Sequence, residues 1–252
     1  MKFSDKSSLG PNIHYFKCDL RSIDDIAAAG REIRARLGEP TILVNNAGVA
    51  RGKTVLGGSD ADLRLTFEVN ALAHFRTVRE FLPAMAARDH GIVVTVASYA
   101  ALMAVPGMVD YGASKAASVV FHEGLSAELS ATAPRVRTIL VCQGHVRTPL
   151  FEGYDTGSPF LVPALEPETV ADAVCEQIFS GRSGQVNIPI LGSISAYLRT
   201  LPYWYAYGTR ARATFMMKNW KGRQVIQDDD EKQAAEEGNP GDTEESVVMV
   251  PQ

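Results

Sequence analysis

The stretch GIVVTVASYAALMAVPGMVDYGASKAASVV, residues 91–120, predicts a buried strand that leads through a loop into a helix. Residues 92–97 are apolar and rich in β-branched side chains, which is typical of a strand covered on both faces. Pro106 and Gly107 interrupt the pattern, and small and apolar residues return at helical spacing from residue 111 onward. We therefore expect a strand, a loop and a helix in that order.

The polar residues of this stretch suit acid–base chemistry. Tyr111 and Lys115 are four residues apart, so on a helix the phenol and the ammonium share one face. A neighbouring cation favours the phenolate and would lower the phenol's pKa from its usual value of ~10. Ser98 ends the strand and would add a neutral hydrogen-bond donor beside the phenol. We expect all three groups at the carboxyl edge of an open α/β sheet, where ligands bind.

Two asparagine motifs occur upstream of this stretch. The motif Asn-Asn-Ala-Gly at residues 45–48 follows a predicted apolar strand at residues 41–44. Asn70 lies inside a predicted helix, where its amide competes for backbone hydrogen bonds, so by itself it indicates a kink or a buried polar contact. Together with Ser98 and the Tyr-x-x-x-Lys spacing, these motifs resemble the signature of the short-chain dehydrogenases/reductases over roughly residues 12–190.

The resemblance implies an α/β fold, a Rossmann-like doubly wound parallel sheet, and a set of catalytic residues. In that set Tyr111 exchanges a proton with the substrate oxygen, and Ser98 hydrogen-bonds the same oxygen. Lys115 lowers the phenol's pKa and binds the nicotinamide ribose, while Asn70 anchors a relay water. The implied cofactor is NAD or NADP, which carries the hydride. The residues implied to contact the cofactor are Asp19, Asn46, Ala47, Gly48, Tyr111, Lys115, Gly144, Val146 and Thr148.

One position of the family's pattern, Asp19, has an alternative explanation, and another, Gln143, departs from the pattern. Asp19 matches an aspartate that lies near the adenine ring, but it fits equally well as a turn residue before a helix. After a predicted strand at residues 136–141, the family's Pro-Gly-x-Val-x-Thr is present except that Gln143 replaces the proline. Without the fixed φ of proline, we expect this loop to be less rigid.

The sequence contains no Gly-x-x-x-Gly-x-Gly motif, the glycine-rich turn that cradles the pyrophosphate in a dinucleotide-binding fold. The first recognisable strand, at residues 12–18, corresponds to the family's third. We therefore expect a chain shortened at its N-terminus that lacks the first strand–helix–strand unit and exposes apolar sheet edges. The residue that selects between NAD and NADP belongs to the same missing region.

Patterns elsewhere predict the remaining elements. Ser22 and Ser59 each precede an acidic residue by three positions, which indicates that helices begin after them. A helix at residues 167–178 and a last strand at 185–190 follow from their apolar spacing. Residues 149–166 contain several prolines and glycines and predict a mobile loop over the substrate.

Composition divides the chain into three parts. We expect an incomplete Rossmann-like domain at residues 1–190, an extension at 191–227 and an acidic tail at 228–252. Residues 177–227 contain seven basic residues and no acidic ones, interleaved with aromatic residues, which suits a segment on an anionic membrane surface. A helix packed on the domain is the alternative. The tail has nine acidic residues and one lysine, which predicts disorder.

Overall composition argues against several kinds of protein. The 252 residues, 46% of them hydrophobic, can form the core of one sizeable domain. A pI near 5.8 argues against nucleic-acid binding. The cysteines and histidines lack metal-ligand spacing, so we expect reduced thiols and no metal site. No apolar run has the length of a membrane span and the start lacks a signal peptide's apolar region, so we expect an intracellular protein.

The predicted function is that of an NAD(P)-dependent oxidoreductase that interconverts an alcohol and a carbonyl. The extension resembles the membrane-associated branch with the retinol and 17β-hydroxysteroid dehydrogenases. That resemblance implies an apolar, lipid-like substrate of retinoid or steroid type and a location at the endoplasmic reticulum membrane or lipid droplets, and otherwise in the cytoplasm. A homodimer is the expected assembly. Two alternatives stay open: a non-catalytic truncated remnant that dimerises through its two long helices, and a membrane-surface binding module.

Overall fold

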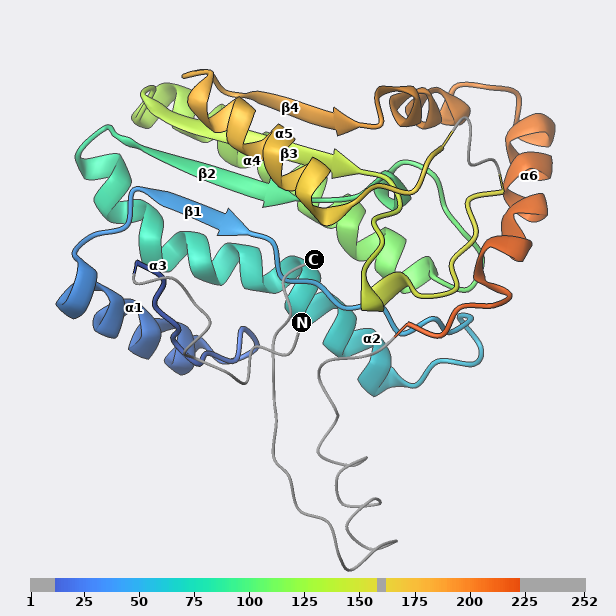
Figure 1. The fold of residues 1–252 in the computed structure, drawn as a ribbon, viewed down its shortest axis with the longest axis horizontal. Coiled ribbons are helices and arrows are strands. Elements are labelled where there is room, and N and C mark those ends of the chain that lie inside the picture. Colours follow the sequence, from blue (N-terminus) through green and yellow to red (C-terminus); the bar gives the residue numbers. More distant parts are fainter. Residues whose placement is uncertain (1–11, 158–161, 223–252) are drawn as a thin grey trace, which may run out of the picture.

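The computed structural model describes residues 12–157 and 162–222 (Figure 1). Its centre is a sheet of four parallel strands in the order β1-β2-β3-β4, which confirms the predicted Rossmann-like α/β class. Parallel strands in chain order need crossover connections, so the carboxyl ends of all four meet at one edge. The strands are β1 (Ile42–Asn45), β2 (Gly91–Val96), β3 (Val136–Gln143) and β4 (Gly184–Ile188).

Helices cover both faces of this sheet (Figure 1). Residues of β2 alternate between the two faces: Val93 packs with α3 and α4, whereas Ile92 and Val94 pack with α5. Because both faces are covered, β2 is buried along its whole length, as its continuous apolar sequence predicts. The helices are α1 (Ile23–Leu37), which packs on α3, α2 (Asp60–Phe67), α3 (Ala73–Ala87), α4 (Val109–Thr132) and α5 (Pro167–Phe179).

The two predicted helix starts are confirmed, and the second helix is interrupted. Ser22 accepts a hydrogen bond from the backbone of Asp25, and Ser59 forms a capping box with Asp62. Between α2 and α3 the chain forms a π-helical turn, η2 (Glu68–Leu72), which contains Asn70. Asn70 therefore marks both a distortion of the helix and a buried polar contact, as its position predicts.

The strand predicted at residues 12–18 is wrong, because this segment forms no ladder with any described strand. A strand without a neighbour cannot pair its backbone groups, whatever its β propensity. The outer edge of β1 is likewise unpaired within the described residues, and Ile42 and Val44 are 43% and 47% exposed. Both features agree with a sheet in which β1 stands at an open edge.

The C-terminal part of the described chain is helical. The last strand ends at Ile188, two residues earlier than predicted. Beyond it follow η5 (Ile190–Arg199), α6 (Tyr203–Arg212) and η6 (Ala213–Met217). Figure 1 shows α6 beyond the carboxyl ends of the strands. The acidic tail predicted at residues 228–252 lies outside the described residues.

Candidate active site

The end of β2 and the first turns of α4 bring Ser98, Tyr111 and Lys115 together. The Ser98 hydroxyl hydrogen-bonds the Tyr111 phenol. Tyr111 and Lys115 are 1% and 0% exposed, so both lie on the buried face of α4. Lys115 Nζ donates to the carbonyl of Val96 at 2.9 Å and lies 5.8 Å from the centre of the Tyr111 ring. The three side chains predicted to converge at this edge do so, and their catalytic roles stay predictions.

Burial controls the protonation of both groups. It raises the pKa of Tyr111 above its usual value, and the hydrogen bond from Ser98 opposes this only in part. It also lowers the pKa of Lys115 to about 8. The pKa of Tyr111 therefore lies above its usual value, because loss of water destabilises the phenolate more than its neighbours stabilise it, and the lowering of this pKa by Lys115 stays a prediction. At neutral pH the phenol is protonated.

Asn70 links the loop after β1 to α4. Its amide oxygen accepts from the Val49 backbone at 2.8 Å, and its amide nitrogen donates to the Val49 carbonyl at 2.9 Å and to Ser114 Oγ at 3.0 Å. Ser118 Oγ donates to the Asn70 carbonyl at 2.7 Å. These are contacts to protein groups other than Lys115, so the relay-water role of Asn70 stays a prediction.

Ser114 and Ser118 were not recognisable from the motif alone, but their spacing carries a signal. Together with Tyr111 and Lys115 they occupy positions three, four and seven residues apart along α4, which is one face of a helix. All four side chains are buried. A search for polar residues on the face of the tyrosine would therefore have found both serines.

The Asn-Asn-Ala-Gly loop follows β1 and lies at the same edge of the sheet. Asn45 Oδ1 accepts from Thr77 Oγ1 at 2.7 Å, which holds the start of the loop against α3. The next three residues, Asn46, Ala47 and Gly48, are partly buried and do not line the pocket described below. Their contact with a cofactor stays a prediction.

The loop after β3 lies beside Tyr111. Gly144, Val146 and Thr148 line the same pocket as Tyr111. Gly144 N donates to the Ile188 carbonyl at 2.8 Å, so the loop is tied to the end of β4. The expected loss of rigidity at Gln143 is not supported, because this residue is buried in β3 and pairs with Ile188 in the ladder.

An apolar pocket opens in front of Ser98 and Tyr111. Its cavity volume is about 100 Å³. Much of its wall comes from residues that no sequence motif indicated, because they converge from segments far apart in the chain. Its apolar lining includes Met103, Val105, Met108, Phe151, Val162 and Met216, and its further polar lining includes Tyr99, His145, Tyr154 and Thr156.

The comparison with protein families identifies this arrangement. The sequence model described as "short chain dehydrogenase" matches residues 4–158, more than half of the chain. The chain belongs to the short-chain dehydrogenase family. Within this short-chain dehydrogenase, the matched residues contain all four proposed catalytic side chains, Ser98, Tyr111, Lys115 and Asn70.

Two relatives of this short-chain dehydrogenase are named as dehydrogenases of estradiol and of retinol. It is 39% identical over 194 residues to estradiol 17-beta-dehydrogenase 11 of Homo sapiens, covering 77% of this chain and 62% of that protein. It is 36% identical over 167 residues to epidermal retinol dehydrogenase 2 of Homo sapiens, covering 66% of this chain and 54% of that protein. The chain therefore spans less than two thirds of these relatives.

Solved structures confirm the fold. A metagenomic short-chain oxidoreductase in complex with NADP is 28% identical, with a TM-score of 0.56, over 68% of this chain and 71% of that one. A short-chain dehydrogenase from Streptomyces avermitilis is 23% identical, with a TM-score of 0.62, over 79% of this chain and 77% of that one, and supports the fold alone.

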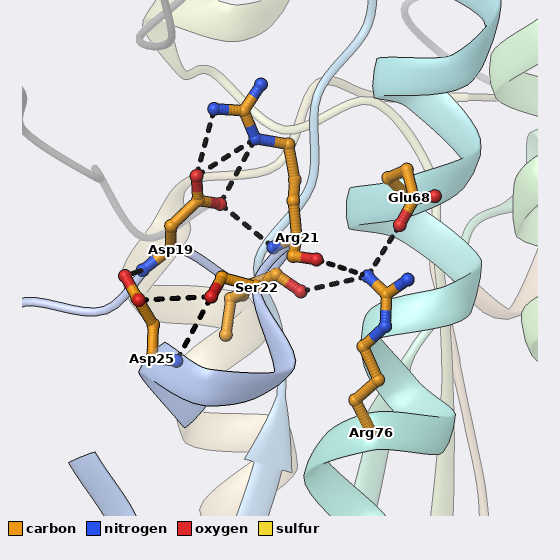
Figure 2. Close-up of polar contacts among 7 residues, drawn as sticks. Asp19, Arg21, Ser22, Asp25, Glu68 and Arg76 are labelled. Atoms are coloured by element: carbon orange, nitrogen blue, oxygen red, sulfur yellow. Dashed lines mark hydrogen bonds and ion pairs between the residues drawn. The ribbon is translucent and has the colours of Figure 1, made fainter. Parts of the chain in front are cut away.

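Among the described residues, the side chain of Asp19 forms its hydrogen bonds and its ion pair with Arg21 (Figure 2). Its carboxylate forms an ion pair with Arg21 at 2.9 Å, and its backbone nitrogen donates to Asp25 at 3.3 Å. Hydrogen bonds and the charge of Arg21 outweigh burial and lower the pKa of Asp19. These contacts support the role of a residue at the start of α1, and contact with adenine stays a prediction.

Residues 12–157 and 162–222 contain no cluster of ligating side chains able to hold a metal ion. Over the same ranges, no helix combines the length and apolarity needed to cross a bilayer.

Proposed function

We propose that this short-chain dehydrogenase interconverts an alcohol and a carbonyl group, with NAD or NADP as the hydride carrier. One observation supports this proposal most directly: Ser98 and Tyr111 are hydrogen-bonded to one another in the wall of an apolar pocket. Carbonyl reduction needs a proton donor and a second hydrogen-bond donor at the same oxygen. Membership of the family agrees with this chemistry.

Tyr111 is the proton-transferring residue in this proposal. Because burial keeps its phenol protonated, Tyr111 donates a proton to the substrate oxygen during reduction and recovers it during oxidation. Ser98 donates a hydrogen bond to the same oxygen. Lys115, one helical turn away and with a pKa of about 8, stabilises the phenolate that forms when the proton leaves.

The residues around Tyr111 fit the nicotinamide end of the cofactor. The nicotinamide, when bound, supplies or accepts the hydride. Gly144, Val146 and Thr148 line the pocket beside Tyr111, and in this proposal their backbone and the Thr148 hydroxyl would hold the nicotinamide amide. Lys115 lies behind the phenol and would hold the ribose. We assign no residue to the pyrophosphate, because the sequence has no glycine-rich turn of the expected form.

The apolar pocket and the names of the relatives support a steroid or retinoid substrate. Met103, Met108 and Phe151 supply flexible and aromatic surface suited to fused rings or a polyene chain. Estradiol and retinol are the substrates that the names of two relatives give. We propose the same class of substrate for this chain.

Replacement of the phenol tests the proposed reaction. Tyr111→Phe removes the transferable proton and keeps the ring, so we expect kcat/KM for estradiol or retinol to fall by at least ~100-fold. The assay follows NADH and NADPH fluorescence with each substrate, and Tyr15→Phe, at an exposed tyrosine, is the matched control. Unchanged turnover in Tyr111→Phe, or no binding of either cofactor by the wild type at millimolar concentrations, would contradict the proposal.

A second proposal concerns the exposed apolar side chains of η5 and α6, which we call the aromatic surface. Within the described residues, this surface carries Arg210 and Arg212 at the end of α6 and has no acidic residue of its own. We propose that it binds an anionic membrane surface, such as that of the endoplasmic reticulum or a lipid droplet. Its exposed members are Ile190, Leu191, Ile194, Tyr197, Tyr203, Trp204, Tyr205 and Tyr207.

The expected alternative for this extension, packing on the domain, holds for part of it. Arg199 donates to the carbonyls of Ala101 and Leu102 at 2.7 and 3.2 Å. Met216 and Met217 also pack against the domain. The extension is therefore attached at Arg199 and η6, and the part of the aromatic surface on α6 lies between these attachments.

We propose a homodimer formed through α3 and α4. Phe75 is 43% exposed and Val120 is 68% exposed, and the Phe75 and Phe121 rings are 4.5 Å apart between centres. A charge in this apolar face would oppose pairing, so Val120→Glu is expected to run as a monomer in size-exclusion chromatography with light scattering. A monomeric wild type would refute the dimer. A dimer without turnover would favour the non-catalytic remnant.

A further inference from the structure

A C-terminal strap, which we define as residues 213–221, crosses the loop at residues 149–157 and reaches the pocket. Met216 and Met217 of the strap pack against the buried cluster that contains Tyr111. The strap is therefore part of the environment of the proposed catalytic residue, although more than fifty positions in sequence separate it from the end of the family match.

The strap fits closely against two glycines that have positive φ. At Gly153, with φ of 80°, a Cβ atom would lie 1.9 Å from the carbonyl oxygen of Asn219. At Gly52, with φ of 62°, a Cβ atom would lie 2.0 Å from the indole of Trp220. Any side chain at either position would displace the strap, so its path depends on these two glycines.

Hydrogen bonds tie the strap to the loop beneath it. Trp220 Nε1 donates to the Leu150 carbonyl at 3.0 Å, and the backbone nitrogen of Asp155 donates to the Met216 carbonyl at 3.1 Å. The main chain at Met216 is therefore held on one side by the loop and further along by Trp220. The part of the pocket wall that Met216 forms is therefore fixed in position.

Two adjacent methionines of the strap have different surroundings. Met216 lines the pocket, and its Sδ accepts a hydrogen bond from the Tyr154 hydroxyl at 3.4 Å. Met217 packs over Gly107 and is not among the described residues that line the pocket. The two side chains have the same size and chemistry, so they form a natural pair of test and control.

We infer that Met216 contacts the substrate and determines which apolar shapes the pocket accepts. This inference rests on the proposed function for the identity of the pocket as the substrate site. A methionine side chain is normally adaptable, but here the Tyr154 hydroxyl holds its sulfur and Asp155 holds its main chain. A slender ligand gains contact area from this wall, whereas a broad ligand of fused rings competes with it for space.

The test compares the dissociation constants of all-trans-retinol and estradiol, measured by calorimetry without cofactor, for wild type, Met216→Ala and Met217→Ala. For Met216→Ala we expect the ratio of the estradiol constant to the retinol constant to fall by roughly fivefold or more, because estradiol gains space and retinol loses contact. For Met217→Ala the ratio is expected to stay within about twofold of the wild-type value. Met216→Phe adds bulk and should shift the ratio in the opposite direction.

Three outcomes would overturn the inference: no binding of either ligand by the wild type, an unchanged ratio in both Met216 variants, or the same shift in Met217→Ala as in Met216→Ala. Turnover in Tyr111→Phe reports separately on the proposed function. If the wild type shows no turnover but the ratio responds to Met216 alone, the proposed reaction fails, and Met216 still determines which apolar ligands the pocket accepts. If turnover depends on Tyr111 but the ratio does not respond to Met216, the proposed reaction stands and the inference about Met216 fails.

Discussion

At the scale of single residues, buried polar groups are the features on which the site depends most. Asn70 satisfies both backbone groups of Val49 and connects them to Ser114 on α4. The poor helix propensity of asparagine indicated a buried contact, but its partners lie 21 and 44 positions away. Only the packing of the loop after β1, η2 and α4 brings them within hydrogen-bond distance.

Asn70→Leu removes these hydrogen bonds and replaces the amide with an apolar side chain of similar size. The Val49 N–H and carbonyl would then be buried without partners, and we expect the free energy of unfolding to fall by about 3 kcal/mol. Urea unfolding followed by circular dichroism measures the change. Ser130→Ala, at an exposed serine near the end of α4, is the control. A loss below about 1 kcal/mol would show that the network is not needed for stability.

The burial of His74 and His122 predicts that the folded protein loses stability at acidic pH. Both are buried, and burial lowers the pKa of His74 to about 3 and that of His122 to about 4. In the unfolded chain both pKa values return to ~6.5, so below that pH the unfolded chain binds more protons than the folded one. Their contribution to stability is therefore complete above pH ~6.5 and is lost as the pH falls toward the folded values.

His74→Leu tests this dependence. Between about pH 6 and pH 4.5 we expect the variant to lose stability less steeply than the wild type, by up to ~1.4 kcal/mol per pH unit. The measurement is urea unfolding at several pH values in this range. Equal slopes for both proteins would show that His74 is already protonated in the folded state.

At the scale of elements, the open edge of β1 affects residues 12–18 and β1 itself. Residues 12–18 have strand-like composition, but without a paired neighbour they form no ladder. The edge of β1 is unpaired within the described part of the chain, and Val44 on it is exposed. Exposed apolar edges of this kind promote association between chains.

Val44→Lys places a charge on this edge. Since Val44 is half exposed, we expect little change in stability, within about 0.5 kcal/mol, and a clear decrease in concentration-dependent association. Light scattering over a range of protein concentrations measures this. Val55→Lys, at an exposed valine outside the sheet, is the control. Association that responds equally to both variants would place the contact elsewhere.

At the scale of the whole molecule, the aromatic surface and the pocket lie toward the same end of the sheet. Figure 1 shows α6 beyond the carboxyl ends of the strands, and Ser98 and Tyr111 stand at that edge. The strap continues from α6 to the pocket. An apolar substrate dissolved in a membrane would therefore have a short path to Tyr111 from a protein bound through this surface.

The variant with Trp204→Ser and Tyr203→Ser tests this arrangement. Both side chains are more than 70% exposed, so their loss should leave the fold intact and weaken sedimentation with phosphatidylserine-containing vesicles by roughly tenfold or more. Leu56→Ser, at an exposed leucine far from α6 in the chain, is the control. Equal sedimentation of all three proteins would exclude the aromatic surface as the membrane contact.

The sequence alone determined the class of fold, the order of most elements and the convergence of Ser98, Tyr111 and Lys115. These features depend on local periodicity and on the rule that parallel strands end at one edge, and both can be read along the chain. Tertiary structure alone decided the protonation of Tyr111, the partners of Asn70 and the place of Met216 in the pocket. Each of these depends on burial or on contact between distant segments, and a linear pattern carries no measure of how much water a group loses on folding.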